Sequence, residues 1–115
     1  METFSGTVQK GTKRAAALGF PTVNIPLDDS AVSGIYAAQV VVGGKSYDAA
    51  AFADQTRSVL EAHILDTDLD LYGKEITVEL LKKIRDNKEF EDDDALRTAI
   101  ADDVAKVRTY FSESV

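Results

Sequence analysis

Alternation of apolar and polar residues predicts strands over the first three quarters of the chain. Over residues 75–81, for example, every second position is apolar, which is the period of a half-buried strand. The predicted strands cover residues 40–42, 47–52, 57–65 and 75–81. Gly43 and Gly44 separate the first two, and this pair favours a two-residue hairpin turn because both turn positions need a positive φ.

The period changes after Asp92, where apolar residues begin to recur every three or four positions. This stripe consists of Leu96, Ile100, Val104, Val107 and Phe111. Three aspartates at 92–94 stand at its start, where carboxylates cap free backbone amides and complement the helix dipole. We therefore predict five or six short strands followed by one helix. That order is typical of a mainly β protein, a closed or nearly closed antiparallel barrel with the helix packed on it.

Composition narrows the function classes. With 115 residues, 44% hydrophobic and 29% charged, the sequence predicts a single globular domain over 1–115. The absence of cysteine excludes disulfides and thiolate metal sites, and the single histidine disfavours a zinc site. A net charge of −7 disfavours nucleic-acid binding, and the sequence has neither a signal peptide pattern nor a long apolar run. We expect a cytoplasmic monomer that binds neither nucleic acid nor membrane.

Residues 21–26 offer the first candidate site. Prolines at both ends favour an extended segment, in which Thr22 and Asn24 share one face while Val23 and Ile25 share the other. A hydroxyl and an amide carbonyl are hard oxygen ligands that suit a Mg²⁺ held mainly by substrate phosphates and water. The alternative is that both side chains bond only to the local backbone.

The strand predicted around Glu61 offers the second candidate site. Leu60, Ala62 and Ile64 form its apolar face, which places Glu61 and His63 together on the other. A carboxylate held on a rigid strand can take a proton from an alcohol, which is general-base chemistry. The alternatives are a solvated strand face or a Glu–His hydrogen bond.

No Walker A motif, G-x-G-x-x-G loop or protein-kinase catalytic loop is present, so any use of ATP needs another architecture. Over about residues 4–110, however, the order of short motifs resembles the riboflavin kinase family. The motifs are LGFPTVN at 18–24, GIY at 34–36, EAHILD at 61–66, LYGK at 71–74, and Ile84-Arg85 followed by Phe90.

The resemblance implies a six-stranded antiparallel Greek-key barrel with the terminal helix beside it. It also implies transfer of the γ-phosphate of ATP to the riboflavin 5′-hydroxyl, which gives FMN and ADP. By the same resemblance, Thr22 and Asn24 would hold Mg²⁺ on the ATP phosphates, Glu61 would be the base, and Arg85 and Phe90 would line the flavin side. The residues that the resemblance assigns to nucleotide and phosphate binding are Gly11, Lys13, Arg14, Gly19, Pro21, Thr22 and Asn24.

The sequence departs from the family pattern at two places. The phosphate loop, G-x-x-R-G-R in the family, keeps Arg14 but has Ala15 and Ala16 in place of the glycine and the second arginine. The connection at 51–58 lacks the N-I-G-x-[RN]-P-T-like loop that borders the flavin in the family. Two other functions therefore stay open: a catalytically weak or inactive flavin- or nucleotide-binding module on the same barrel, and a kinase for a different small alcohol.

Overall fold

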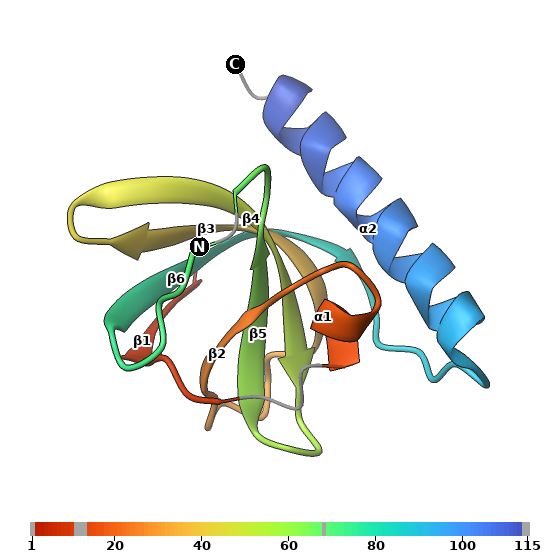
Figure 1. Ribbon diagram of the computed structural model, residues 1–115, viewed down its shortest axis with the longest axis horizontal. Helices are drawn as coiled ribbons and strands as arrows, with labels where there is room; N and C mark the ends of the chain where they lie inside the picture. The colour runs from red at the N-terminus through yellow and green to blue at the C-terminus, as the bar shows by residue number, and fades with distance from the viewer. Residues whose placement is uncertain (1, 11–13, 68, 114–115) are drawn as a thin grey trace.

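Six antiparallel strands form one sheet in the computed structural model, which describes residues 2–10, 14–67 and 69–113 (Figure 1). The strands are β1 (Glu2–Thr7), β2 (Val23–Pro26), β3 (Gly34–Val42), β4 (Lys45–Asp54), β5 (Val59–Ile64) and β6 (Glu75–Arg85). The helices are α1 (Arg14–Ala17) and α2 (Asp93–Glu113).

The strand order β1-β6-β3-β4-β5-β2 is a Greek key, because β3, β4 and β5 follow one another and β6 returns beside β3. β1 contacts β2, and the bridge between Gln9 and Asn24 continues this contact, so the sheet curls into a nearly closed barrel. The predicted fold is confirmed: a mainly β barrel of six antiparallel strands with a C-terminal helix.

The predicted strands are correct in position but differ in length. β3 begins at Gly34, well before residue 40, and β6 continues to Arg85, four residues past the predicted end. β5 is shorter than predicted, since Ser58 takes a positive φ of 53° in the turn before it. The hairpin turn at Gly43 and Gly44 is confirmed, with φ values of 57° and 79°.

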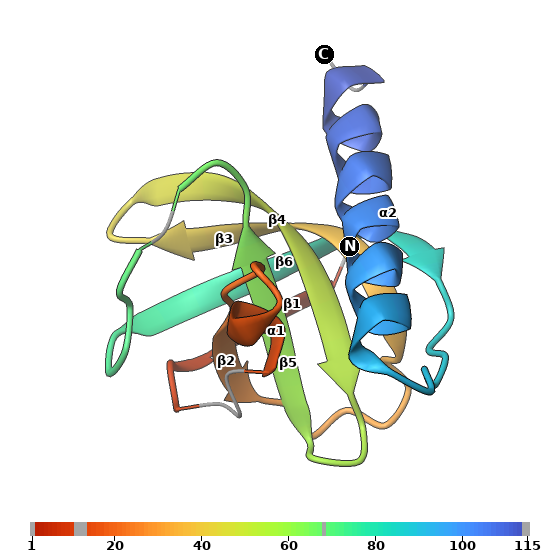
Figure 2. The same ribbon diagram turned by 45° about the vertical axis from the view of Figure 1, so that its right-hand side comes forward.

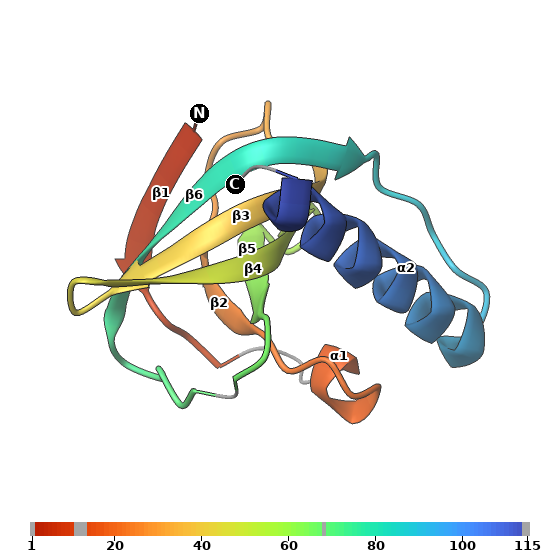
Figure 3. The same ribbon diagram turned by 90° about the horizontal axis from the view of Figure 1, so that it is seen from above.

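Two apolar cores lie on opposite faces of the sheet. The barrel interior is filled by residues such as Ile25, Val40, Leu60 and Val78. The outer core lies between the sheet and α2, which packs against β4, β3 and β6 (Figures 2 and 3). Its central residues are Leu18, Ala37, Ala50, Leu65, Ile100, Val104 and Val107.

α2 begins where the aspartates predict it. The Asp92 carboxylate accepts a hydrogen bond from the backbone N–H of Ala95 at 2.8 Å, which satisfies one of the free amides of the first turn. The apolar stripe then faces the barrel, with Ile100, Val104 and Val107 buried. Within the described part of the chain, no helix combines the length and the apolar character that crossing a membrane requires.

Candidate active site

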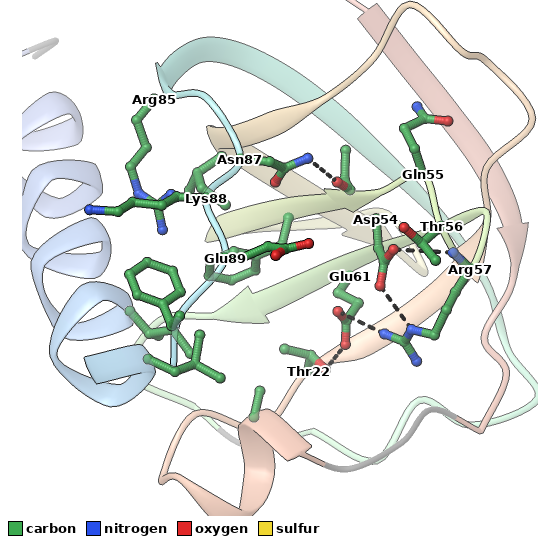
Figure 4. Close-up of a pocket in the computed structure, with 17 residues that line it drawn as sticks. Thr22, Asp54, Gln55, Thr56, Arg57, Glu61, Arg85, Asn87, Lys88 and Glu89 are labelled. Atoms are coloured by element: carbon green, nitrogen blue, oxygen red, sulfur yellow. Dashed lines mark hydrogen bonds and ion pairs between the residues drawn. The ribbon is translucent and has the colours of Figure 1, made fainter. Parts of the chain in front are cut away.

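A cavity of about 820 Å³ opens between the outer face of the barrel, the start of α2 and the segment that joins β6 to α2 (Figure 4). Four of the residues predicted for the site line it: Thr22, Glu61, Arg85 and Phe90. The other lining residues are Ala15, Ile35, Phe52, Ala53, Asp54, Gln55, Thr56, Arg57, Asn87, Lys88, Glu89, Leu96 and Ile100. The structure thus brings the candidate base and the candidate flavin contacts to one space.

Glu61 projects from β5 toward this cavity, and its side chain is only 18% exposed. The Thr22 hydroxyl donates to Glu61 Oε1 at 3.3 Å, and Arg57 Nη2 donates to Oε2 at 3.2 Å. Burial raises the pKa of the Glu61 carboxyl above its ordinary value, an effect that the Arg57 charge and the Thr22 hydrogen bond partly offset. Glu61 is therefore a carboxylate fixed in place and a stronger base than a solvated one.

Thr22 and Asn24 lie on the same face of the segment, as predicted. Asn24 is paired with Glu61 across the β2–β5 ladder, and directly paired residues of antiparallel strands project to the same side. The Asn24 side chain is 6% exposed, and its Oδ1 has no hydrogen-bond partner among the residues that the structure describes. The Thr22 hydroxyl bonds to Glu61, so the alternative of purely local backbone bonding is wrong for Thr22. For Asn24 it stays open.

His63 does not pair with Glu61, so the alternative of a Glu–His hydrogen bond is also wrong. Its Nδ1 lies 2.8 Å from the carbonyl oxygen of Pro21. A carbonyl only accepts, so the Nδ1–H group is the donor. The His63 ring also packs edge-on against Phe20 at a centroid distance of 5.5 Å. His63 therefore anchors the segment that carries Thr22 to β5.

Arg85 and Phe90 lie together on the opposite side of the cavity. The Arg85 guanidinium carbon is 5.6 Å from the centre of the Phe90 ring, a cation–π distance. Gly34 permits this arrangement, because a Cβ there would lie 2.4 Å from the Arg85 carbonyl oxygen. With its φ of 97°, Gly34 lets the start of β3 approach the end of β6 closely.

The candidate phosphate loop is described only in part. Gly11 and Lys13 lie outside the described residues, as does the side chain of Arg14, whose backbone begins α1. Gly19 lies in the turn that follows this short helix, with a φ of 96°, and its N–H donates to the carbonyl of Ala16 at 3.0 Å. The role predicted for these residues in phosphate binding stays a prediction.

Comparison with known proteins matches residues 2–111 to the family model described as Flavokinase: Riboflavin kinase. The chain belongs to the riboflavin kinase family. The family prediction made from the motifs is thereby confirmed.

Several of the matching proteins have names that include riboflavin kinase. The bifunctional riboflavin kinase/FMN adenylyltransferase of Escherichia coli is 39% identical over 116 residues, which cover 93% of this chain and 37% of that protein. A crystal structure of riboflavin kinase from Trypanosoma brucei matches with a TM-score of 0.66 and 26% identity, over 96% of this chain and 76% of that one.

A third relative has a different name. A crystal structure of a protein from Streptococcus pneumoniae, named as a macrolide-efflux protein, matches with a TM-score of 0.77 and 27% identity, over 92% of this chain and 36% of that one. The chain thus spans little more than a third of the length of the bacterial relatives from Escherichia coli and Streptococcus pneumoniae.

The two departures from the family pattern have simple structural forms here. Ala15 and Ala16 lie within α1, and neither is among the residues with positive φ, so the alanines fit the backbone they occupy. The short connection is a four-residue turn at 55–58, because residues 51–54 belong to β4.

That turn supplies site residues which the sequence patterns did not indicate. Arg57 Nε donates to Asp54 Oδ2 at 2.8 Å, and the Arg57 backbone N–H donates to Asp54 Oδ1 at 3.1 Å. Burial alone would raise the pKa of Asp54, but the hydrogen bonds and charge of Arg57 together with the Thr56 amide lower it. In the sequence, the position of Arg57 four residues before the candidate base Glu61 was the signal that could have indicated this contact.

Proposed function

We propose that this chain is a riboflavin kinase module that transfers the γ-phosphate of ATP to the 5′-hydroxyl of riboflavin, giving FMN and ADP. One observation carries the proposal: a partly buried, hydrogen-bonded carboxylate, Glu61, faces a cavity together with Thr22. Asn24 does not line the cavity but pairs with Glu61 across the β2–β5 ladder. A base next to two oxygen ligands is the set of groups that phosphoryl transfer to an alcohol needs.

Glu61 is the general base of the proposed reaction. Its carboxylate takes the proton of the riboflavin 5′-hydroxyl as that oxygen attacks the γ-phosphorus and the bond to the β-phosphate oxygen breaks. The raised pKa supports this role, because a carboxylate with a higher proton affinity accepts the alcohol proton more readily. Thr22 and Arg57 hold the two carboxylate oxygens and so fix their direction.

Thr22 and Asn24 fit a Mg²⁺ ion. Among the described residues Asn24 Oδ1 is a buried acceptor without a protein partner, and a cation would satisfy it. When bound, Mg²⁺ would neutralise charge on the ATP phosphates. Within the described residues no group of three or more histidine, cysteine, aspartate or glutamate side chains could hold a metal. Such a sparse protein ligand set suits an ion held mostly by phosphate and water.

The acceptor occupies the other side of the cavity in this proposal. Phe90 offers an aromatic face and Arg85 offers planar N–H donors, which suit a flat heterocycle that carries carbonyl oxygens. Gly11, Lys13, Arg14, Gly19 and Pro21 are proposed to surround the nucleotide phosphates. We further propose a monomeric, cytoplasmic module, consistent with a sequence that has no cysteine.

The Arg57–Glu61 ion pair favours a second candidate function, a module that binds flavin or nucleotide with little turnover. The Arg57 guanidinium bonds to the Glu61 carboxylate and so competes with the substrate hydroxyl for the oxygen that must accept the proton. The two functions differ in whether bound ATP and riboflavin react with each other.

The test is incubation of the purified chain with MgATP and riboflavin, with FMN and ADP measured by chromatography. We expect catalytic formation of both products in equal amounts. Riboflavin binding without FMN would support the binding module. ADP formation that depends on another alcohol, with none on riboflavin, would support a kinase with a different acceptor.

A further inference from the structure

Asp103 is a charged residue inside the apolar stripe of α2. Ile100, Val104 and Val107 surround it on that face, and its exposed fraction is 1%. A carboxylate in such a place is unfavourable unless it is paired and hydrogen-bonded. Its burial therefore calls for a specific partner.

That partner is Arg85, at the end of β6. Arg85 Nε donates to Asp103 Oδ1 at 2.8 Å, and Nη2 donates to Oδ2 at 2.8 Å. A third nitrogen, Nη1, donates to the carbonyl oxygen of Asp86 at 3.0 Å. The bidentate fork fixes both the position and the plane of the guanidinium.

Arg85 also lines the cavity, while Asp103 does not (Figure 4). Its guanidinium has five N–H donors, and the three bonds to Asp103 and Asp86 use three of them in the described part of the chain. Two N–H donors of Arg85 are left, and the guanidinium carbon lies over the Phe90 ring. Asp103 thus affects the cavity only by fixing the orientation of the Arg85 guanidinium.

We propose that Asp103 is a positioning residue for the acceptor: it holds the Arg85 guanidinium so that its remaining donors meet the carbonyl oxygens of a flat heterocycle. The inference rests on the proposed function, in which that heterocycle is riboflavin. α2 then has a role in acceptor binding beyond its packing, since it contributes Leu96 and Ile100 to the cavity wall as well.

A second ion pair between α2 and the barrel provides a matched control. Arg108 on α2 bonds to the Asp66 carboxylate at 2.8 and 2.9 Å, just after β5. The two side chains are 48% and 74% exposed, and neither residue lines the cavity. Asp66→Asn removes one carboxylate charge from the α2–barrel contact, as Asp103→Asn does, without touching Arg85.

The experiment compares steady-state kinetics of the wild type, Asp103→Asn and Asp66→Asn with riboflavin and ATP varied separately. For Asp103→Asn we expect the KM for riboflavin to rise about tenfold or more, as for loss of a charged hydrogen bond, with the KM for ATP unchanged. Asp66→Asn should leave both constants unchanged. An unchanged KM for riboflavin in Asp103→Asn, or equal increases for both substrates, would overturn the inference.

A double variant separates positioning from stability. Arg85→Met with Asp103→Leu replaces the buried pair by apolar side chains, an exchange that commonly preserves or raises stability. We expect this variant to melt at or above the temperature of Asp103→Asn and still to bind riboflavin weakly. Riboflavin binding at the wild-type level would overturn the inference. Absence of both turnover and riboflavin binding in the wild type would instead overturn the proposed function.

Discussion

The two faces of β2, β5 and β4 use alternate residues of the same strands for different purposes. On the inner face, Val23 and Ile25 pair with Ala62 and Leu60, and all four are buried in the barrel interior. On the outer face, each polar side chain near the cavity has its own environment: Thr22 bonds to Glu61, Glu61 bonds also to Arg57, and Asn24 Oδ1 has no partner.

The difference separates the positions that hold the fold from those proposed to position the substrates. Inner-face residues contribute by filling volume, so similar apolar residues can replace them at modest cost. The polar outer-face residues near the cavity contribute through particular atoms, and two of them are unfavourable for the fold without ligands. Burial raises the pKa of Glu61, and Asn24 buries an acceptor without a donor. Both features make sense when ligands complete the outer face.

Removal of divalent metal should have the largest effect on activity and no effect on the stability that the packed inner face provides. With excess EDTA we expect FMN formation to fall to background, because Thr22 and Asn24 would lose the ion that neutralises the ATP phosphates. The melting temperature of the protein without ligands should not change. Addition of excess Mg²⁺ should restore the rate, measured as FMN formed per minute. Undiminished activity in EDTA would contradict the metal assignment.

Leu60→Ala should have the largest effect on the fold. Leu60 is fully buried in the barrel interior, and loss of such a side chain costs about 2–5 kcal/mol through lost transfer energy and the cavity left behind. Urea unfolding monitored by circular dichroism would measure the loss. The activity per folded molecule should remain close to that of the wild type. A stable variant with little activity would contradict the division between the two faces.

Asn24→Leu should have the reverse effect of Leu60→Ala, raising stability while lowering activity. The change removes a buried acceptor that has no partner, so we expect the free energy of unfolding to rise by about 1–3 kcal/mol. At the same time the rate at limiting Mg²⁺ should fall about tenfold or more, because a candidate metal ligand is lost. Urea unfolding and a Mg²⁺ titration of the rate give both values. A destabilised variant with normal Mg²⁺ dependence would show that Asn24 is structural.

The smallest expected effect is on the pH dependence of stability. A carboxyl whose pKa is raised by folding favours the folded state below its unfolded pKa, and this contribution is lost as pH rises through the folded pKa. For Glu61 the window therefore begins near the ordinary value of 4.5 and extends upward. In metal-free buffer, Glu61→Gln should gain stability relative to the wild type as pH rises from 4 to 7. Melting temperatures across that range would reveal the trend, and a constant difference would oppose it.

Much of the fold could be predicted because its pattern is local. The alternation in β6, the glycine pair of the hairpin and the aspartates before α2 each depend on neighbouring residues, and all three are confirmed. Strand ends were predicted less well. At the end of β6, Gly34 of the neighbouring strand β3 allows a close approach to Arg85. The two residues are far apart in the sequence, so no local pattern reveals that contact.

The candidate site divides in the same way. The shared face of Thr22 and Asn24 follows from strand geometry, and the motifs singled out Glu61, Arg85 and Phe90. Arg57 and Asp103 were missed, since an arginine in a turn and an aspartate in a helix are ordinary surface residues until tertiary structure gives them partners. The bond of His63 to the Pro21 carbonyl is likewise a long-range contact.

The central claim is that Glu61 is the base of a riboflavin kinase, and Glu61→Gln tests it most directly. The amide keeps the shape and the hydrogen bond with Thr22 but cannot accept the hydroxyl proton. The measurement is kcat for FMN formation, with riboflavin and ATP binding determined on the same preparation. If Glu61 is the base, kcat should fall about 10²–10⁴-fold while both substrates still bind. A kcat close to that of the wild type would contradict it.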